Sequence, residues 1–94
     1  MGTTTTEALR VVAFREGETW VAQCLEYDIQ AQGSTFQCAT RRLRGAVSSE
    51  ARYTTDKHGE PFKGIDAAPS MYVDLFESAE QPMHADNVEM RIAA

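Results

Sequence analysis

The spacing of the apolar residues changes at Gly33, and this change constrains the fold more than any other feature of the sequence. Before Gly33, the segments 8–14, 19–25 and 29–33 are short and either apolar or alternating between apolar and polar residues, which is typical of β-strands. After Gly33, apolar residues recur at steps of three and four, which is typical of an amphipathic helix. The sequence therefore predicts three strands followed by a helix.

Short polar turns separate the three predicted strands. Residues 15–18 include Gly17, which can adopt positive φ, and residues 26–28 form a charged bend. The second strand is fairly apolar on both faces, with Trp20, Ala22 and Cys24 on one and Val21, Gln23 and Leu25 on the other. Such a strand suits the middle of a sheet that a helix covers. Turns of this length indicate an antiparallel meander.

The helix after Gly33 is predicted to have one apolar face and one basic face. Ser34 or Thr35 can cap its N-terminus. We expect Phe36, Ala39, Leu43, Ala46, Val47 and Tyr53 on the apolar face, and Arg41, Arg44, Ser48 and Arg52 on the solvated face. We also expect the rings of Trp20 and Tyr53 in the core. Glu50 falls within the apolar face, so its carboxylate either reaches solvent or an arginine, or contacts a neighbouring chain.

The C-terminal half has weaker signals. Residues 54–69 are rich in glycine, proline and aspartate and predict a mobile connector without secondary structure. Residues 71–79 favour a short amphipathic helix, with a strand as the rival interpretation, and residues 87–93 alternate as a closing strand does. We therefore expect an α+β fold of order βββααβ: an antiparallel meander, a helix packed on one sheet face, a short second helix and a returning C-terminal strand.

Size and charge set the class of protein. Ninety-four residues suit one domain, with residues 1–7 as a disordered tail and 8–94 as the folded unit. The net charge of -5 disfavours nucleic-acid binding by the whole domain. No apolar run is long enough to cross a bilayer and the start lacks an export signal, so we expect a cytoplasmic protein in which Cys24 and Cys38 are free thiols.

Signatures of catalysis are missing from the sequence. There is no phosphate-binding glycine loop, no GxSxG and no HExxH motif. His58 in the connector and His84 in a second expected loop have no neighbours that mark them as bases or ligands. Glu26 and Asp28 could share a metal ion, but two carboxylates are too few for a hydrolytic site. We expect no metal, no cofactor and no enzymatic activity.

Residues 20–47, WVAQCLEYDIQAQGSTFQCATRRLRGAV, resemble the HicB-like antitoxin family, in which a strand and a short bend lead through a turn into an amphipathic helix. The segments 20–28 and 32–35 carry the resemblance, although Ser34 stands where the family typically has aspartate. The resemblance implies a truncated RNase H-like fold without catalytic carboxylates, self-assembly into dimers or larger oligomers, and neutralisation of a small basic RNA-cleaving toxin.

Three function classes remain open at this stage. As a toxin-binding domain, the chain would contact its partner through Glu26, Tyr27 and Asp28 on the bend, and would pair with a second copy at an open sheet edge. The second class is a stand-alone oligomeric domain that has lost its toxin and binds a small ligand between subunits. The third is a metal-dependent hydrolase that uses Glu26 and Asp28.

Two activities are not expected. The first strand contains no acid where an RNase H-type nuclease needs one, so we expect no nuclease activity. No helix-turn-helix fits after residue 87, so we expect no direct DNA binding.

Overall fold

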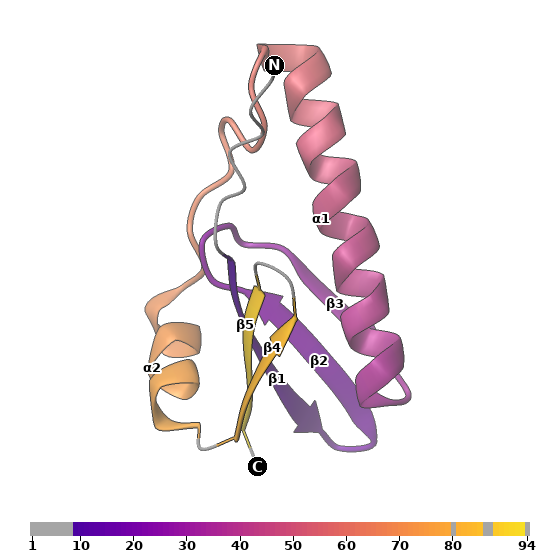
Figure 1. Cartoon of the computed structure of the whole chain (residues 1–94), viewed down its shortest axis with the longest axis vertical. Coiled ribbons are helices and arrows are strands. Elements are labelled where there is room, and N and C mark those ends of the chain that lie inside the picture. Colours follow the sequence, from indigo (N-terminus) through magenta and orange to yellow (C-terminus); the bar gives the residue numbers. More distant parts are fainter. Residues whose placement is uncertain (1–8, 80, 86–87, 94) are drawn as a thin grey trace.

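The computed structural model describes residues 9–79, 81–85 and 88–93, so the expectation about residues 1–7 lies outside the described part of the chain. The described residues form a five-stranded sheet and two helices (Figure 1). In chain order the elements are β1 (Leu9–Glu16), β2 (Thr19–Cys24), β3 (Gln30–Gly33), α1 (Phe36–His58), α2 (Ser70–Ser78), β4 (Gln81–Ala85) and β5 (Val88–Ile92). The predicted α+β class is confirmed.

The sheet is mixed, with the strand order β3-β2-β1-β5-β4. β1 pairs antiparallel with β2, and β2 with β3, which confirms the predicted meander. β5 returns beside β1 and runs parallel to it, with Leu9 opposite Val88. β4 pairs antiparallel with β5 at the edge. The first strand therefore lies at the centre of the sheet, between the meander and the C-terminal hairpin.

The C-terminal half confirms one expectation and differs from the prediction in two places. The segment 70–78 is a helix, as the preferred interpretation predicts, and the rival interpretation as a strand is wrong. Strand β4 was not predicted, because its sequence QPMHA lacks a clear apolar-polar alternation; His84 consequently lies in a strand and not in a loop. Helix α1 continues five residues into the predicted connector, so His58 is its last residue. Gly59 then ends the helix with a left-handed φ of 85° and donates its N–H to the Thr55 carbonyl.

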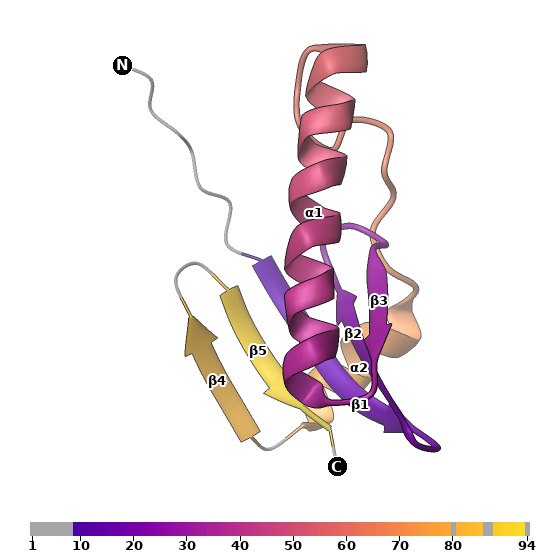
Figure 2. The same ribbon diagram turned by 90° about the vertical axis from the view of Figure 1, so that its right-hand side faces the viewer.

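The two helices lie on opposite faces of the sheet (Figures 1 and 2). One core cluster joins α1 to the sheet and consists of Val11, Ala22, Cys24, Ile29, Ala39 and Leu43. A second cluster on the other face joins Val12 and Leu25 to Phe76 of α2. The prediction of a helix packed on one sheet face is confirmed for α1, and α2 covers the opposite face at β1 and at Leu25, the residue after β2. No described helix is long and apolar enough to cross a membrane.

The turn between β3 and α1 requires its glycine. A Cβ atom on Gly33 would lie 2.7 Å from the backbone nitrogen of Ala39, a distance that Cβ contacts essentially never show. Thr35 caps the helix, because its side-chain oxygen accepts a hydrogen bond from the Cys38 N–H at 3.0 Å. The predicted N-terminal cap is therefore confirmed, and Thr35 supplies it.

The exposure of α1 corrects the prediction for Tyr53. Tyr53 is 56% exposed, whereas its neighbour Thr54 is buried. Eighteen residues make five turns of an α-helix, so Thr54 repeats the angular position of Phe36, while Tyr53 lies about 100° away from it. Trp20 does pack on the core as expected, and its ring meets Phe36 edge-to-face at a centroid distance of 5.7 Å.

Candidate functional site

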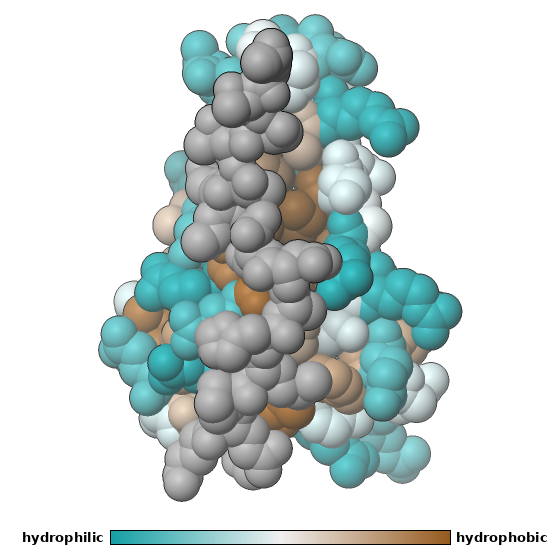
Figure 3. Space-filling model, viewed as in Figure 1, coloured by the Kyte–Doolittle hydropathy of each residue, from teal (hydrophilic) through white to brown (hydrophobic). Residues whose placement is uncertain are grey.

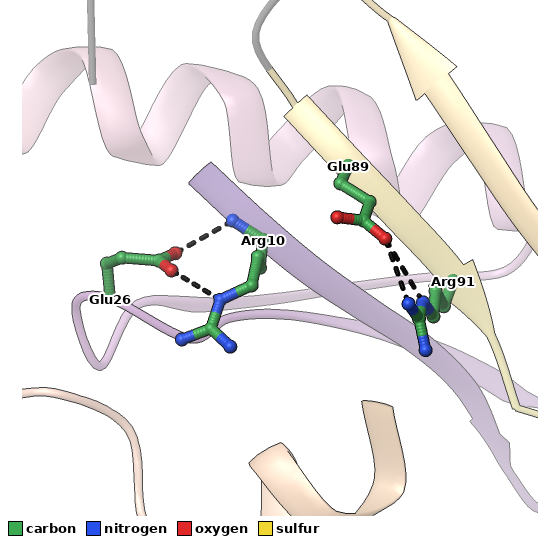
Figure 4. Close-up of polar contacts among 4 residues, drawn as sticks. All are labelled: Arg10, Glu26, Glu89 and Arg91. Atoms are coloured by element: carbon green, nitrogen blue, oxygen red, sulfur yellow. Dashed lines mark hydrogen bonds and ion pairs between the residues drawn. The ribbon is translucent and has the colours of Figure 1, made fainter. Parts of the chain in front are cut away.

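The charged bend after β2 is the candidate contact surface, and the structure gives its residues different roles. Glu26 forms an ion pair with Arg10, with 2.6 Å between Oε2 and Nε, and its Oε1 accepts the Arg10 backbone N–H at 2.7 Å (Figure 4). The hydrogen bond that the Arg10 guanidinium donates to Glu26 raises the pKa of Arg10 above its usual value. Glu26 therefore ties the bend to β1.

Tyr27 ties the bend to the connector. Its ring stacks on Phe62 with a centroid distance of 4.1 Å and an interplanar angle of 16°. Phe62 has a positive φ of 66°, which is uncommon outside glycine, and its N–H donates to the Thr54 hydroxyl at 2.6 Å. The stack and this hydrogen bond hold Phe62 against both the bend and the end of α1.

The connector is also joined to the bend through its backbone. The Asp28 N–H donates to the Asp66 carbonyl at 2.7 Å, and the Ala68 N–H donates to the Leu25 carbonyl at 3.0 Å. Ile65 packs against the α1-side core between these two attachments and the Phe62 ring. The connector therefore follows a defined path across the bend, and it forms one wall of an adjoining cleft.

This cleft, which we call the bend cleft, lies between the bend, the middle of α1 and the connector. It has a volume of about 570 Å³ and is lined by Asp28, Ile29, Gln30, Ala46, Ser49, Glu50 and Ile65. Its lining combines two carboxylates, from the bend and from α1, with three apolar side chains. Figure 3 shows hydrophobic residues gathered beside the middle of α1, with hydrophilic residues around its far end.

The two carboxylates of the bend cleft differ from Glu26 in their contacts. Asp28 is exposed, and one of its oxygens accepts from Gln23 Nε2 at 3.1 Å. Gln23 is buried at 1% exposure and also accepts from Gln30 Nε2 at 2.9 Å, so it positions two residues of the cleft. Among the described residues, neither Asp28 nor Glu50 forms an ion pair. The described residues also contain no group of three or more acidic, histidine or cysteine side chains placed to hold a metal ion.

The sequence identified the bend but missed the cleft. The one sequence signal for the cleft was Glu50, a carboxylate within the apolar face of the predicted helix. The cleft could not be predicted because one of its walls is the connector, for which the sequence predicted no defined path. The basic residues Arg41, Arg44 and Arg52 are exposed on α1, as predicted for a solvated face.

A second, apolar groove lies between α1 and β5 on the same sheet face. Its volume is about 100 Å³, and its apolar lining residues are Leu9, Val11, Leu43, Val47, Val88 and Met90. The groove is open because α1 packs mainly over β2 and β3 and leaves the β5 side of the sheet less covered (Figure 2).

The cysteines are free thiols, as predicted. Cys24 is buried between the sheet and α1, and desolvation raises the pKa of its thiol. Cys38 is half-buried near the start of α1. Burial of Cys24 in an apolar cluster gives it a packing role.

Comparison of the chain with protein-family models, with curated proteins and with solved structures found no match.

Proposed function

We propose that this chain is a protein-interaction domain of the HicB-like antitoxin type, which neutralises a small basic RNA-cleaving protein by binding it. The bend cleft carries the proposal, because Asp28 and Glu50 line it without ion-pair partners among the described residues. The chain as a whole has a net charge of -5. Complementary charge raises the rate of encounter with a basic partner and selects against acidic ones.

The arrangement of the strands supports the same proposal. A meander, a helix on one sheet face and a strand that returns parallel to β1 are the parts that a truncated RNase H-like fold would supply. In the centre of β1, Val11, Val12 and Ala13 are buried apolar residues. Apolar packing thus occupies the centre of the strand in which a nuclease of that fold needs an aspartate to hold its metal.

We further propose that the domain forms a homodimer through an open edge of its sheet. In the described sheet, β3 and β4 each have a neighbouring strand on one side only. Unpaired N–H and C=O groups along such an edge can pair with a second copy. The apolar groove beside β5 adds surface that favours association on the β4 side. Light scattering coupled to size exclusion at micromolar concentration should give a dimer or larger mass, and a monomer would contradict this part of the proposal.

The binding proposal is tested with the purified product of the gene adjacent to the one for this chain. We expect a small basic protein, a complex detectable by calorimetry, and inhibition of RNA cleavage when this chain is added. A large neutral or acidic neighbour without measurable binding would contradict the proposal. A thermal-shift screen separates the alternative function: small ligands that stabilise the oligomer, without any protein partner, would favour a stand-alone ligand-binding domain.

A further inference from the structure

We infer that the bend cleft binds one arginine side chain of the partner, with the guanidinium between Asp28 and Glu50 and the aliphatic part on the apolar wall. The source of this side chain rests on the proposed function. The preference of the cleft for a guanidinium group rests on the lining residues alone and can be measured without the partner.

The charge of the cleft selects a cation. Asp28 comes from the bend and Glu50 from α1, and neither is paired with a base among the described residues. Two unpaired carboxylates facing one cleft give it a negative potential, which attracts cations and repels anions. Within the described part of the chain, the side chain of Asp28 accepts a hydrogen bond from Gln23 at one of its two carboxylate oxygens.

The apolar lining selects a cation with an aliphatic part. A hard divalent ion such as Ca²⁺ or Mg²⁺ takes six or more oxygen ligands and gains nothing from hydrocarbon walls. Ile29, Ala46 and Ile65 occupy a large share of this lining, and they can pack against the methylene groups of a long side chain. An organic cation therefore uses both halves of the lining, whereas a metal ion uses only one.

The separation of the acceptors over two elements favours guanidinium over ammonium. A guanidinium group has five N–H donors in a plane and is more weakly hydrated than an ammonium group. Its donors point in several directions within one plane, which suits a cleft whose carboxylates, Asp28 and Glu50, come from two elements, and the lining also contains the polar residues Gln30 and Ser49. A lysine side chain concentrates its three donors at one point and fits such a spread of acceptors less well.

The walls of the cleft are held in place before any ligand binds. Buried Gln23 contacts both Asp28 and Gln30, at 3.1 and 2.9 Å. The connector wall is fixed on either side of Ile65, by the Phe62–Tyr27 stack and by the backbone hydrogen bond from Asp28 to Asp66. A preorganised site loses less free energy in ordering its own side chains on binding.

The first experiment titrates the folded chain with N-acetyl-arginine-N-methylamide and follows backbone amide shifts by NMR. We expect saturable shifts at Ile29, Gln30, Ser49 and Ile65, with a dissociation constant in the millimolar range. The citrulline analogue has the same shape without the charge, and we expect it to bind at least about tenfold more weakly. We expect the lysine analogue to bind several-fold more weakly than the arginine analogue. Equal binding of arginine and citrulline, or shifts confined to another surface, would overturn the inference.

The second experiment removes the charges while keeping the shape. The double substitution Asp28→Asn with Glu50→Gln should weaken binding of the arginine analogue by about tenfold or more. The matched control, Asp74→Asn with Glu77→Gln, makes the same charge change at exposed positions of α2 and should leave binding within about twofold. An equal loss in both variants would show a general charge effect and overturn the inference.

Failure of this inference can be told apart from failure of the proposed function. If the basic partner binds the chain but the arginine analogue does not, the arginine-binding role of the cleft is wrong and the proposed function stands. If the arginine analogue binds in the cleft and the neighbouring gene product does not bind, the guanidinium site stands and the proposed partner is wrong.

Discussion

The two halves of α1 are held in different ways. Residues 36–47 lie over the sheet, where Ala39 and Leu43 are buried against β2 and β3. The end of the second half, residues 48–58, extends beyond the strands, with the connector returning alongside it (Figure 1). In this second half only Thr54 is buried. Its hydroxyl accepts the Phe62 N–H and so links the helix to the connector.

This difference separates two sources of stability within one helix. The sheet-bound half is stabilised by removal of apolar surface from water, which scales with area and tolerates small shifts. The distal half depends on a few directional contacts, so the loss of one contact can release a whole segment. The bend cleft lies where the two halves meet, between Ala46 and Glu50. Substitutions in each half therefore test whether stability and local order can be changed independently.

The largest expected effect is in the sheet-bound half. Leu43→Ala should lower the free energy of unfolding by roughly 2–5 kcal/mol, because it removes buried methyl groups and leaves a cavity. Tyr53→Ala, at an exposed position of the distal half, should cost less than about 0.5 kcal/mol. Urea denaturation followed by circular dichroism measures both. A cost for Tyr53→Ala as large as that for Leu43→Ala would show that the distal half packs on the core.

Two glycine substitutions should act in opposite directions. Gly33→Ala should destabilise the fold by about 1–3 kcal/mol, because the new Cβ meets the backbone at Ala39. Gly45→Ala should stabilise it by about 1 kcal/mol, because that helical glycine has open space around it. Thermal unfolding should therefore give a lower melting temperature for Gly33→Ala and a higher one for Gly45→Ala than for the unchanged chain. A stabilising Gly33→Ala would mean that α1 does not start as close to β3 as the structure places it.

A smaller and more local effect is expected at the end of α1. Thr54→Val removes the acceptor of the Phe62 N–H and should cost about 1 kcal/mol. Hydrogen exchange of the Phe62 amide should accelerate, while the amides of β1 and β2 keep most of their protection. Thr55→Val is the control, because the hydrogen bond that the structure describes for the Thr55 hydroxyl goes to the Ala51 carbonyl within α1. Uniform acceleration throughout the sheet would show that the two halves of α1 unfold together.

The smallest effect is the pH dependence from Cys24. Because burial raises the thiol pKa, the folded state keeps its proton while the unfolded state begins to lose it as the pH rises. Stability from this group is complete below the unfolded pKa and falls above it. At pH 8.5, near the ordinary thiol pKa, the loss relative to pH 7 should be at most about 0.4 kcal/mol, the value for a thiol that stays fully protonated in the folded state. The contribution of Cys24 is the difference between the free energies of unfolding of the chain and of its Cys24→Ala variant, measured as a function of pH. Identical pH profiles for the two proteins would contradict the burial of this thiol.

The sequence predicted those elements whose apolar and polar residues follow a regular local spacing. Alternation predicted β2 and β3, and the three- and four-residue spacing from Phe36 predicted α1 and its contact with the sheet. The end of α1 was missed because residues 54–58 are polar and carry no amphipathic pattern, although Gly59 was an available stop signal. For the candidate site, the bend was predicted and Glu50 was recognised as anomalous, but the cleft that joins Asp28 to Glu50 was not.

The amino-acid sequence by itself determined the meander, the start of α1 and the turn at Gly33 between them. These features follow from periodicity and from steric requirements, which act between near neighbours in the chain. Only the tertiary structure decided that β5 lies parallel to β1, that β4 is a strand, and that the connector closes a cleft over the bend. Those features depend on hydrogen bonds and packing between segments far apart in sequence, and their free energy exists only once both segments are brought together.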